Sequence, residues 1–162
     1  MAEMVASWSE DRSRKVGAVI VGSGNETVSV GFNGLPRRVD ATIESRHAKT
    51  NNEKYFWFEH AERNAIYNAV RTGVRLEGTT MYCSSFPCAD CSRAIIQAGI
   101  KKLCTFRYDA SDPFFHRHFL VAEEMMREAQ IEVILFERQD KKISEIRSRY
   151  LDTIDPESGL VR

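Results

Sequence analysis

The sequence has no excess of charge of either sign, since 23 lysines and arginines are balanced by 23 aspartates and glutamates. This balance gives no overall electrostatic footprint for a polynucleotide, whose binding depends on basic side chains that contact phosphates. The chain also lacks an apolar run of membrane-spanning length and a signal-peptide pattern at its start. We therefore expect a soluble, cytoplasmic protein that has neither a polynucleotide nor a membrane as its partner.

Cysteine is scarce, with four in the sequence. Cys83 and Cys104 lie in apolar, strand-like segments, where buried thiols are common. Cys88 and Cys91 are three positions apart, in a segment that begins with Pro87. A Cys-x-x-Cys pair on its own also occurs as a redox pair, so its meaning depends on the residues that accompany it.

The residues that accompany the pair are His60 and, two positions later, Glu62. His60, Cys88 and Cys91 provide three ligands for one zinc ion, and three protein ligands leave the fourth tetrahedral position open, as in catalytic zinc sites. Glu62 can then lean over the open position and move protons between a zinc-bound water and a substrate. The alternative is a closed structural site in which Glu62 is the fourth ligand. The same two motifs mark the zinc-dependent base deaminases.

Both motifs are expected at the starts of helices. An apolar stripe with helical spacing follows His60. Cys88 and Cys91 share one face of a helix if that helix begins near Pro87. The positive end of the helix dipole favours the thiolates that zinc requires.

At 162 residues the chain has the size of one domain. Strand and helix patterns alternate along it, which predicts parallel pairing with helices over both faces of a sheet. We expect a three-layer α/β/α fold with a five-stranded mixed sheet, antiparallel at the first hairpin and parallel after it. The expected strands are 16–21, 27–32, 79–83, 101–106 and 131–136, and the expected helices are 1–8, 60–72, 88–98 and 113–129.

Two segments lack a clear pattern. Residues 37–54 are polar and too long for a simple connection, so we expect them to be functional or partly helical. Residues 140–162 are charged and carry a few apolar residues at helical spacing. We therefore divide the chain into a zinc-dependent domain, residues 1–139, and a helical or loose tail, residues 140–162.

Five motifs resemble those of the cytidine and deoxycytidylate deaminase superfamily, and within it the deoxycytidylate (dCMP) deaminases. They lie at residues 15–21, 31–36, 60–66, 81–91 and 94–100. The zinc motifs are shared by the whole superfamily. The Phe-Asn-Gly-Leu-Pro motif, the insert before His60 and the Ile-Ile-Gln-Ala-Gly-Ile motif are typical of the dCMP branch. The resemblance runs from about residue 9 to residue 136.

The resemblance implies hydrolysis of dCMP to dUMP and ammonia with one zinc ion per subunit, in which zinc hydroxide attacks C4 of cytosine while Glu62 protonates N3. It also implies that Asn33 contacts the sugar and that the backbone N–H of Ala61 meets the pyrimidine carbonyl. The backbone carbonyl of Ser84 would accept a hydrogen bond from the departing amino group. The resemblance further implies a homo-oligomer, and many relatives are regulated by dCTP and dTTP.

The resemblance is weaker at the periphery of the site, where a phosphate would bind. Residues 9–12 read Ser-Glu-Asp-Arg where dCMP deaminases usually have Ser-Lys-Asp-Pro, and Glu59 stands where cysteine or a small residue is frequent. Phosphate recognition needs arginine or lysine side chains that form charge-assisted hydrogen bonds. The candidates near the expected site are Arg14, Lys15, Arg37, Arg38, Arg107 and Tyr108.

Three other functions are compatible with the same metal motifs. The first is a deaminase that acts on a nucleoside, a free base or a modified pyrimidine nucleotide, and a phosphate requirement would separate these. The second is an RNA- or DNA-editing deaminase, which the balanced charge disfavours. The third is a catalytically dead zinc fold that serves as a binding module, which the presence of Glu62 disfavours.

Overall fold

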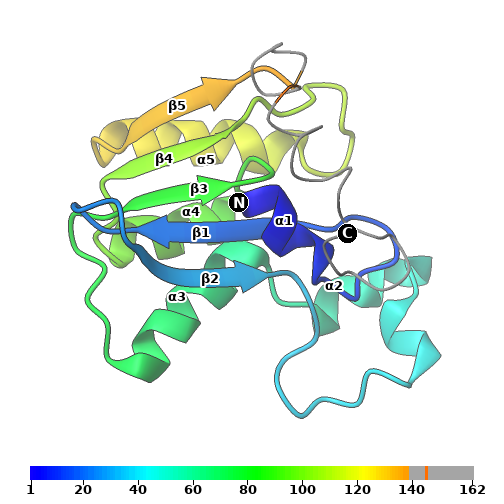
Figure 1. Ribbon diagram of the computed structural model, residues 1–162. Helices are drawn as coiled ribbons and strands as arrows, with labels where there is room; N and C mark the ends of the chain where they lie inside the picture. The colour runs from blue at the N-terminus through cyan, green and yellow to red at the C-terminus, as the bar shows by residue number, and fades with distance from the viewer. Residues whose placement is uncertain (139–144, 146–162) are drawn as a thin grey trace.

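Five strands form one mixed sheet in the order β2-β1-β3-β4-β5 in the computed structural model, which describes residues 1–138 and 145 (Figure 1). The strands are β1 (Gly17–Val21), β2 (Thr27–Phe32), β3 (Thr80–Cys83), β4 (Lys102–Phe106) and β5 (Glu132–Phe136). Each lies inside the range expected for it. The prediction of a five-stranded mixed sheet is therefore confirmed.

The direction of pairing differs from the prediction at β1. This strand pairs antiparallel with both of its neighbours, β2 and β3, whereas the β3–β4 and β4–β5 pairs are parallel. The expectation that every pair after the first hairpin is parallel is thus wrong for β1–β3. Strand β3 runs in the same direction as β2 but joins the opposite edge of β1, so it must meet β1 antiparallel.

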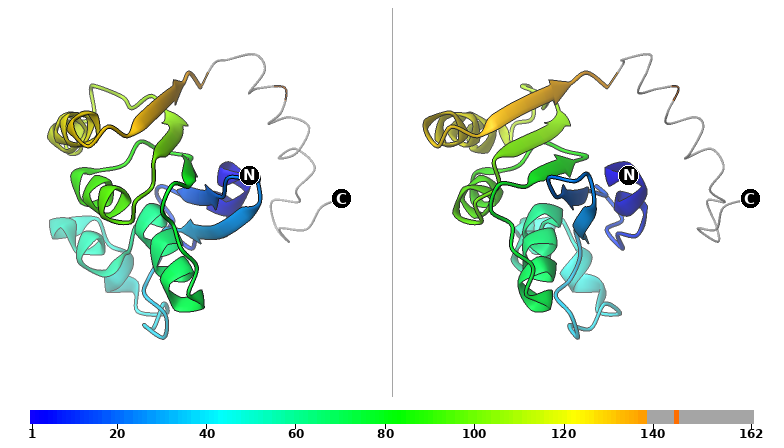
Figure 2. Two further views of the ribbon diagram at one scale, coloured as in Figure 1. Left: turned by 90° about the vertical axis from the view of Figure 1, so that its left-hand side faces the viewer. Right: turned by 60° about the vertical axis from the view of Figure 1, so that its left-hand side comes forward.

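Helices cover both faces of the sheet. They are α1 (Ala2–Ser7), α2 (Lys54–Trp57), α3 (Ala61–Thr72), α4 (Ala89–Gln97) and α5 (His116–Glu128). Figure 2 shows α3, α4 and α5 together on one face and α1 on the other, which gives the three predicted layers. Helices α4 and α5 share a face because both are crossovers between parallel strands added in one direction along the sheet. In the described part of the chain, no helix is both long and apolar enough to cross a bilayer.

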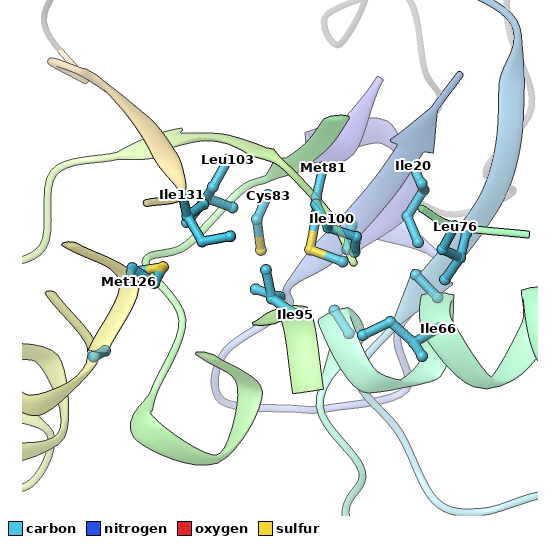
Figure 3. Close-up of a cluster of buried hydrophobic side chains, with 14 of the residues drawn as sticks. Ile20, Ile66, Leu76, Met81, Cys83, Ile95, Ile100, Leu103, Met126 and Ile131 are labelled. Carbon is cyan, nitrogen blue, oxygen red and sulfur yellow. The ribbon is translucent and has the colours of Figure 1, made fainter. Parts of the chain in front are cut away.

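The hydrophobic core lies between the sheet and helices α3, α4 and α5 (Figure 3). Strand residues that point toward these helices meet the apolar stripe of each helix. Buried side chains from both sources include Ile20, Ile66, Met81, Ile95, Leu103 and Met126. Cys83 and Cys104 are buried free thiols, as their apolar surroundings in the sequence predicted. This core holds α3 and α4 so that their starts lie close together.

Residues 37–54 are partly helical, as expected. Two short 3₁₀ helices, η1 (Glu44–His47) and η2 (Thr50–Asn52), lead into α2. An isolated bridge between Gly34 and Glu59 joins the two ends of this insert. Residues 140–162 lie outside the described residues except for Glu145, so the helical tail and the domain boundary at residue 139 stay predictions.

Glycines at two strand positions let helices pack directly onto the sheet backbone. A Cβ atom on Gly31 would lie 2.2 Å from the backbone nitrogen of Ala65 and 2.4 Å from the carbonyl oxygen of Ala61, both in α3. A Cβ atom on Gly17 would lie 2.2 Å from the carbonyl oxygen of Ala2 in α1. The missing side chain in β2 therefore sets how deeply the first turn of α3 sits against the sheet.

Replacing Gly31 with alanine is expected to destabilise the fold, because the new Cβ collides with helix backbone and not with a movable side chain. Overpacking of this kind costs about 1–3 kcal/mol, so the melting temperature should fall by several degrees. Gly24→Ala is the matched control, since a Cβ there meets only the side chain of Glu26. Thermal unfolding followed by circular dichroism measures both variants, and equal melting temperatures would contradict the close approach.

Candidate metal centre and active site

Two helix starts bring the predicted metal ligands together. His60 is the N-cap residue of α3 and Cys88 is the N-cap residue of α4. Cys91 lies in the first turn of α4 and is fully buried. The backbone of each N-cap residue is extended, so the side chains of His60 and Cys88 lie at the N-terminal ends of their helices. The two helix ends meet at one point.

The spacing of the three side chains fits a tetrahedral metal ion. The Nδ1 atom of His60 lies 3.5 Å from Sγ of Cys88 and 3.4 Å from Sγ of Cys91. A zinc ion with ordinary bond lengths to one imidazole and one thiolate separates these atoms by roughly 3.6 Å. All three ligand atoms lie within 4.8 Å of one another, and no other such group occurs among the described residues. The donor set therefore suits one zinc ion.

The charge state of one of the two cysteines, Cys88, also suits a metal, whereas the hydrogen bond between the two thiols raises the pKa of Cys91. The hydrogen bond from the Cys91 thiol, together with that from His60, outweighs burial and lowers the pKa of the Cys88 thiol to about 4. The N-terminus of α4 adds the positive end of a helix dipole. A thiolate is the form that binds zinc, so the site is prepared for a cation before one arrives.

Glu62 lies beside this centre in the first turn of α3 and is only 3% exposed. Burial is the main reason why the pKa of its carboxyl is raised above the usual value. A carboxyl with a raised pKa holds a proton more readily than an ordinary glutamate does, which suits it to general acid–base work. The predicted proton shuttle is thus next to the predicted metal ligands.

A cavity of about 320 Å³ opens beside His60 and Glu62, a size that suits a small molecule. It has polar and aromatic sides. The polar wall consists of Asp11, Ser13, Asn33 and Lys54, and the aromatic residues are Tyr55, Phe58, Phe86, Phe114, Phe115 and Phe119. Tyr55 of α2 stacks on Phe114 with 4.9 Å between ring centroids, so the insert and the segment before α5 meet over the cavity.

The zinc-binding region of the cytidine and deoxycytidylate deaminases matches residues 1–107, which include all three candidate ligands. The chain belongs to this family. An uncharacterised deaminase from the luxG 3′ region of Aliivibrio fischeri is 40% identical to it over 136 residues, which cover 82% of this chain and 86% of that protein.

Deoxycytidylate deaminases are also among the similar proteins. The enzyme from Homo sapiens is 42% identical over 106 residues, which cover 64% of this chain and 58% of the human protein. The chain thus spans little more than half of that relative. The crystal structure of the dCMP deaminase from cyanophage S-TIM5, in complex with dCMP and dUMP, matches with a TM-score of 0.66 at 25% identity, over 83% of this chain and 90% of that one.

Membership of a zinc-binding deaminase family agrees with the geometry of the centre. His60, Cys88 and Cys91 provide the nitrogen and sulfur donors that zinc prefers, at the separation that zinc requires. One zinc ion is therefore the cofactor of this family member. The resemblance to deaminases inferred from the sequence motifs is confirmed.

Asn33 lines the cavity, but its amide group is engaged within the protein. Its Oδ1 accepts a hydrogen bond from the N–H of Val16 at 2.7 Å. Its Nδ2 donates to Oδ2 of Asp11 and to the carbonyl oxygen of Arg14, both at 2.8 Å. Both amide protons are thus used to hold the loop between α1 and β1. The predicted contact between Asn33 and a sugar stays a prediction, and only an Oδ1 lone pair is left for it.

The other two predicted substrate contacts come from two separate segments, the start of α3 and the residue after β3. Ala61 lines the cavity, and its N–H is one of the first in α3, which have no acceptor inside the helix. Ser84 lies just after β3 and is buried. Its carbonyl oxygen accepts a hydrogen bond from Nη2 of Arg138 at 2.9 Å, so a substrate amino group would have to share this acceptor. Both roles stay predictions.

The six phosphate candidates do not lie together. Arg14 lines the main cavity and also a second cavity of about 410 Å³ beside it, which Arg107 and Tyr108 line as well. Lys15, Arg37 and Arg38 line neither of these two cavities. Arg37 donates to Oδ1 of Asn68 instead.

Sequence reasoning missed the charged residues that line the main cavity together with Arg14. Asp11, Lys49, Lys54 and Asp112 all line the main cavity, and Asp112 lies 3.7 Å from the Arg14 guanidinium. These residues come from three separate segments: the loop before β1, the insert with the first residue of α2, and the loop before α5. The sequence does contain one indication of this. Lys54 directly precedes the aromatic residues 55–58, which are able to bury a lysine side chain.

One zinc ion per chain is expected in the purified protein, and Cys91→Ala should lose it together with much of the stability, because assembly of the site is coupled to folding. Cys104→Ala is the matched control, since Cys104 is a buried thiol in β4 outside the metal group. Elemental analysis and thermal unfolding measure both effects. Two zinc ions per chain, or full zinc retention in Cys91→Ala, would show that the ligand set is wrong.

Proposed function

We propose that the protein catalyses the zinc-dependent hydrolytic deamination of dCMP to dUMP and ammonia. The observation that carries this proposal is the open metal centre with a buried carboxyl beside it: three protein donors and, two positions from His60, Glu62. The named activity of the human relative and the dCMP and dUMP bound to the phage enzyme support the choice of substrate.

The chemistry is divided between the metal and the protein. Zinc, when bound, lowers the pKa of a coordinated water and so supplies a nucleophile for C4 at neutral pH. Glu62 takes the proton that this water loses and passes it to N3 of the ring. As the C4–N4 bond breaks, Glu62 takes the proton of the hydroxyl added at C4 and delivers it to the amino group, which leaves as ammonia while C4 becomes a carbonyl. The backbone N–H of Ala61 holds the pyrimidine carbonyl in place.

The phosphate is assigned to Arg14. This residue lines both cavities, and its guanidinium is half-exposed and only loosely paired with Asp112 at 3.7 Å. A guanidinium that is not held by a close partner can form two charge-assisted hydrogen bonds with a phosphate. Selection of a nucleotide over a nucleoside follows from this contact.

Three further features of the protein are part of the proposal. A cytoplasmic location agrees with four cysteines that are free in the described chain. A homo-oligomer agrees with exposed apolar side chains such as Trp8, Phe32, Tyr67 and Val70. Regulation by dCTP and dTTP is suggested by the resemblance alone.

In a panel of cytosine, cytidine, deoxycytidine, CMP, dCMP and dCTP, we expect dCMP to be deaminated with a kcat/KM on the order of 10²-fold above that of deoxycytidine, because the nucleoside leaves the charge-assisted bonds to Arg14 unmade. Loss of the cytosine absorbance measures the rate. Arg14→Gln should reduce the preference for dCMP, whereas Arg37→Gln, which changes a residue outside both cavities, should keep it. Equal efficiency on dCMP and deoxycytidine would favour a nucleoside deaminase instead.

Glu62→Gln is expected to retain zinc and fold while kcat falls by at least about 10²-fold, because glutamine keeps the shape of the side chain but cannot carry the proton. Glu124→Gln on the exposed side of α5 is the control and should keep full activity. Turnover and zinc content are measured on the same preparations. Loss of zinc from Glu62→Gln would make Glu62 a fourth ligand and the site a closed structural one.

A further inference from the structure

A buried ion pair forms part of the polar wall of the main cavity. Lys54, the first residue of α2, is only 6% exposed, and Asp11 is 2% exposed. The Nζ atom of Lys54 lies 2.5 Å from Oδ2 of Asp11 and donates to Oγ of Ser13 at 2.6 Å. Burying two charges costs several kcal/mol of desolvation per ion, and apolar residues of similar size are often at least as stable. The pair therefore calls for an explanation other than stability.

Asp11 has no capacity left for a ligand. Its Oδ1 accepts from the N–H and the hydroxyl of Ser13, both at 2.8 Å, and from the N–H of Arg14 at 3.2 Å. Its Oδ2 accepts from Lys54 and from Nδ2 of Asn33. Burial acts to raise the pKa of Asp11, but these hydrogen bonds outweigh it and hold the pKa below its usual value. Asp11 is thus a fixed anion that holds the other members of the wall.

Lys54 is the member of the wall with a donor to spare. A lysine ammonium has three N–H donors. Ser13 and Asp11 take two, and the described residues provide no third hydrogen-bond acceptor for it. The rings of Phe58 and Tyr55 lie 5.6 and 5.7 Å from Nζ, so the ammonium is held between an aromatic surface and its anion. Because Lys54 lines the cavity, its remaining N–H is available to a bound molecule.

The charge of the pair indicates which part of a nucleotide it meets. Lys54 and Asp11 cancel each other, so this part of the wall attracts a dianionic phosphate only weakly and suits a neutral hydroxyl. Arg14, which is more exposed and loosely paired, is the better phosphate partner. The wall also includes Asn33, and it lines the same cavity as Ala61, whose N–H would hold the base, and as the metal ligand His60. A sugar attached to that base lies between base and phosphate, and therefore along this wall.

We propose that Lys54 is a specificity-determining residue that donates a hydrogen bond to the sugar 3′-hydroxyl of the nucleotide. This inference rests on the proposed function, because dCMP has a single free sugar hydroxyl, the one at the 3′ position. The insert 37–54 thereby gains a function in substrate recognition: it delivers Lys54 to the cavity. Asp11 and Ser13 orient the ammonium, and Asn33 fixes Asp11 in turn.

The test compares two substrates on each of three enzymes. The kcat/KM values of dCMP and of 2′,3′-dideoxycytidine 5′-monophosphate are measured for the wild-type protein, Lys54→Met and Lys54→Arg. The wild type should favour dCMP on the order of tenfold or more, as expected for a hydrogen bond to a charged group. Lys54→Met should use both substrates within about twofold of each other, because the donor that reads the hydroxyl is gone. Lys54→Arg keeps donors and charge and should retain part of the preference.

A loss of stability in Lys54→Met does not change the ratio of the two kcat/KM values. Lys54→Met leaves Asp11 buried and unpaired, so its melting temperature should fall. Both substrates are assayed on the same preparation, however, and the fraction of folded enzyme cancels in their ratio. Lys49→Met is the matched control: this lysine lines the same cavity but is exposed, and its variant should keep the wild-type ratio. An unchanged ratio in Lys54→Met, or a wild type that uses both substrates equally, would overturn the inference.

A binding measurement separates this inference from the proposed reaction. Calorimetry gives the dissociation constants of dUMP and of its 3′-deoxy analogue for the wild type and for Lys54→Met. If no cytosine nucleotide is deaminated but the wild type still prefers dUMP in a manner that depends on Lys54, the reaction is wrong and the hydroxyl contact holds. If neither compound binds, both proposals are overturned.

Discussion

The site depends on the meeting of two helix N-termini at one point beside the sheet. His60 starts α3 and Cys88 starts α4, with Cys91 one turn further along. Each helix is fixed by its apolar stripe, so the ligand geometry is set by core packing and not by the loops around it. Two positive dipole ends at one spot also favour anions. The Cys88 thiolate is therefore tolerated where a protein interior would otherwise disfavour it.

The two ion pairs beside the cavity differ in how far they are exposed to solvent. The Lys54–Asp11 pair is buried and neutral as a whole, while Arg14 and Asp112 face each other at 3.7 Å with the arginine half-exposed. A fixed neutral pair can orient a hydroxyl group, and a loosely held guanidinium can move to meet a phosphate. The two kinds of contact allow one pocket to recognise chemically different parts of one molecule.

The metal centre and most of the fold could be predicted from the sequence because both are encoded by short patterns. The zinc ligands come from two motifs of a few residues, and each strand and helix follows its own periodicity. The antiparallel β1–β3 pair could not be predicted this way, since it depends on which edge of β1 a distant strand joins. The hydrogen bonds that engage Asn33, and the burial of Lys54 against Asp11, likewise join segments far apart in the chain and leave no local pattern.

The two glycines that admit helices to the sheet lie almost back to back. Gly31 pairs with Ala18, next to Gly17 in β1, so α3 on one face and α1 on the other press on neighbouring points of a single backbone layer. No side chain at either glycine cushions these contacts. A displacement of α1 would reach the start of α3 through main chain alone, which mechanically couples the N-terminal helix to the metal centre.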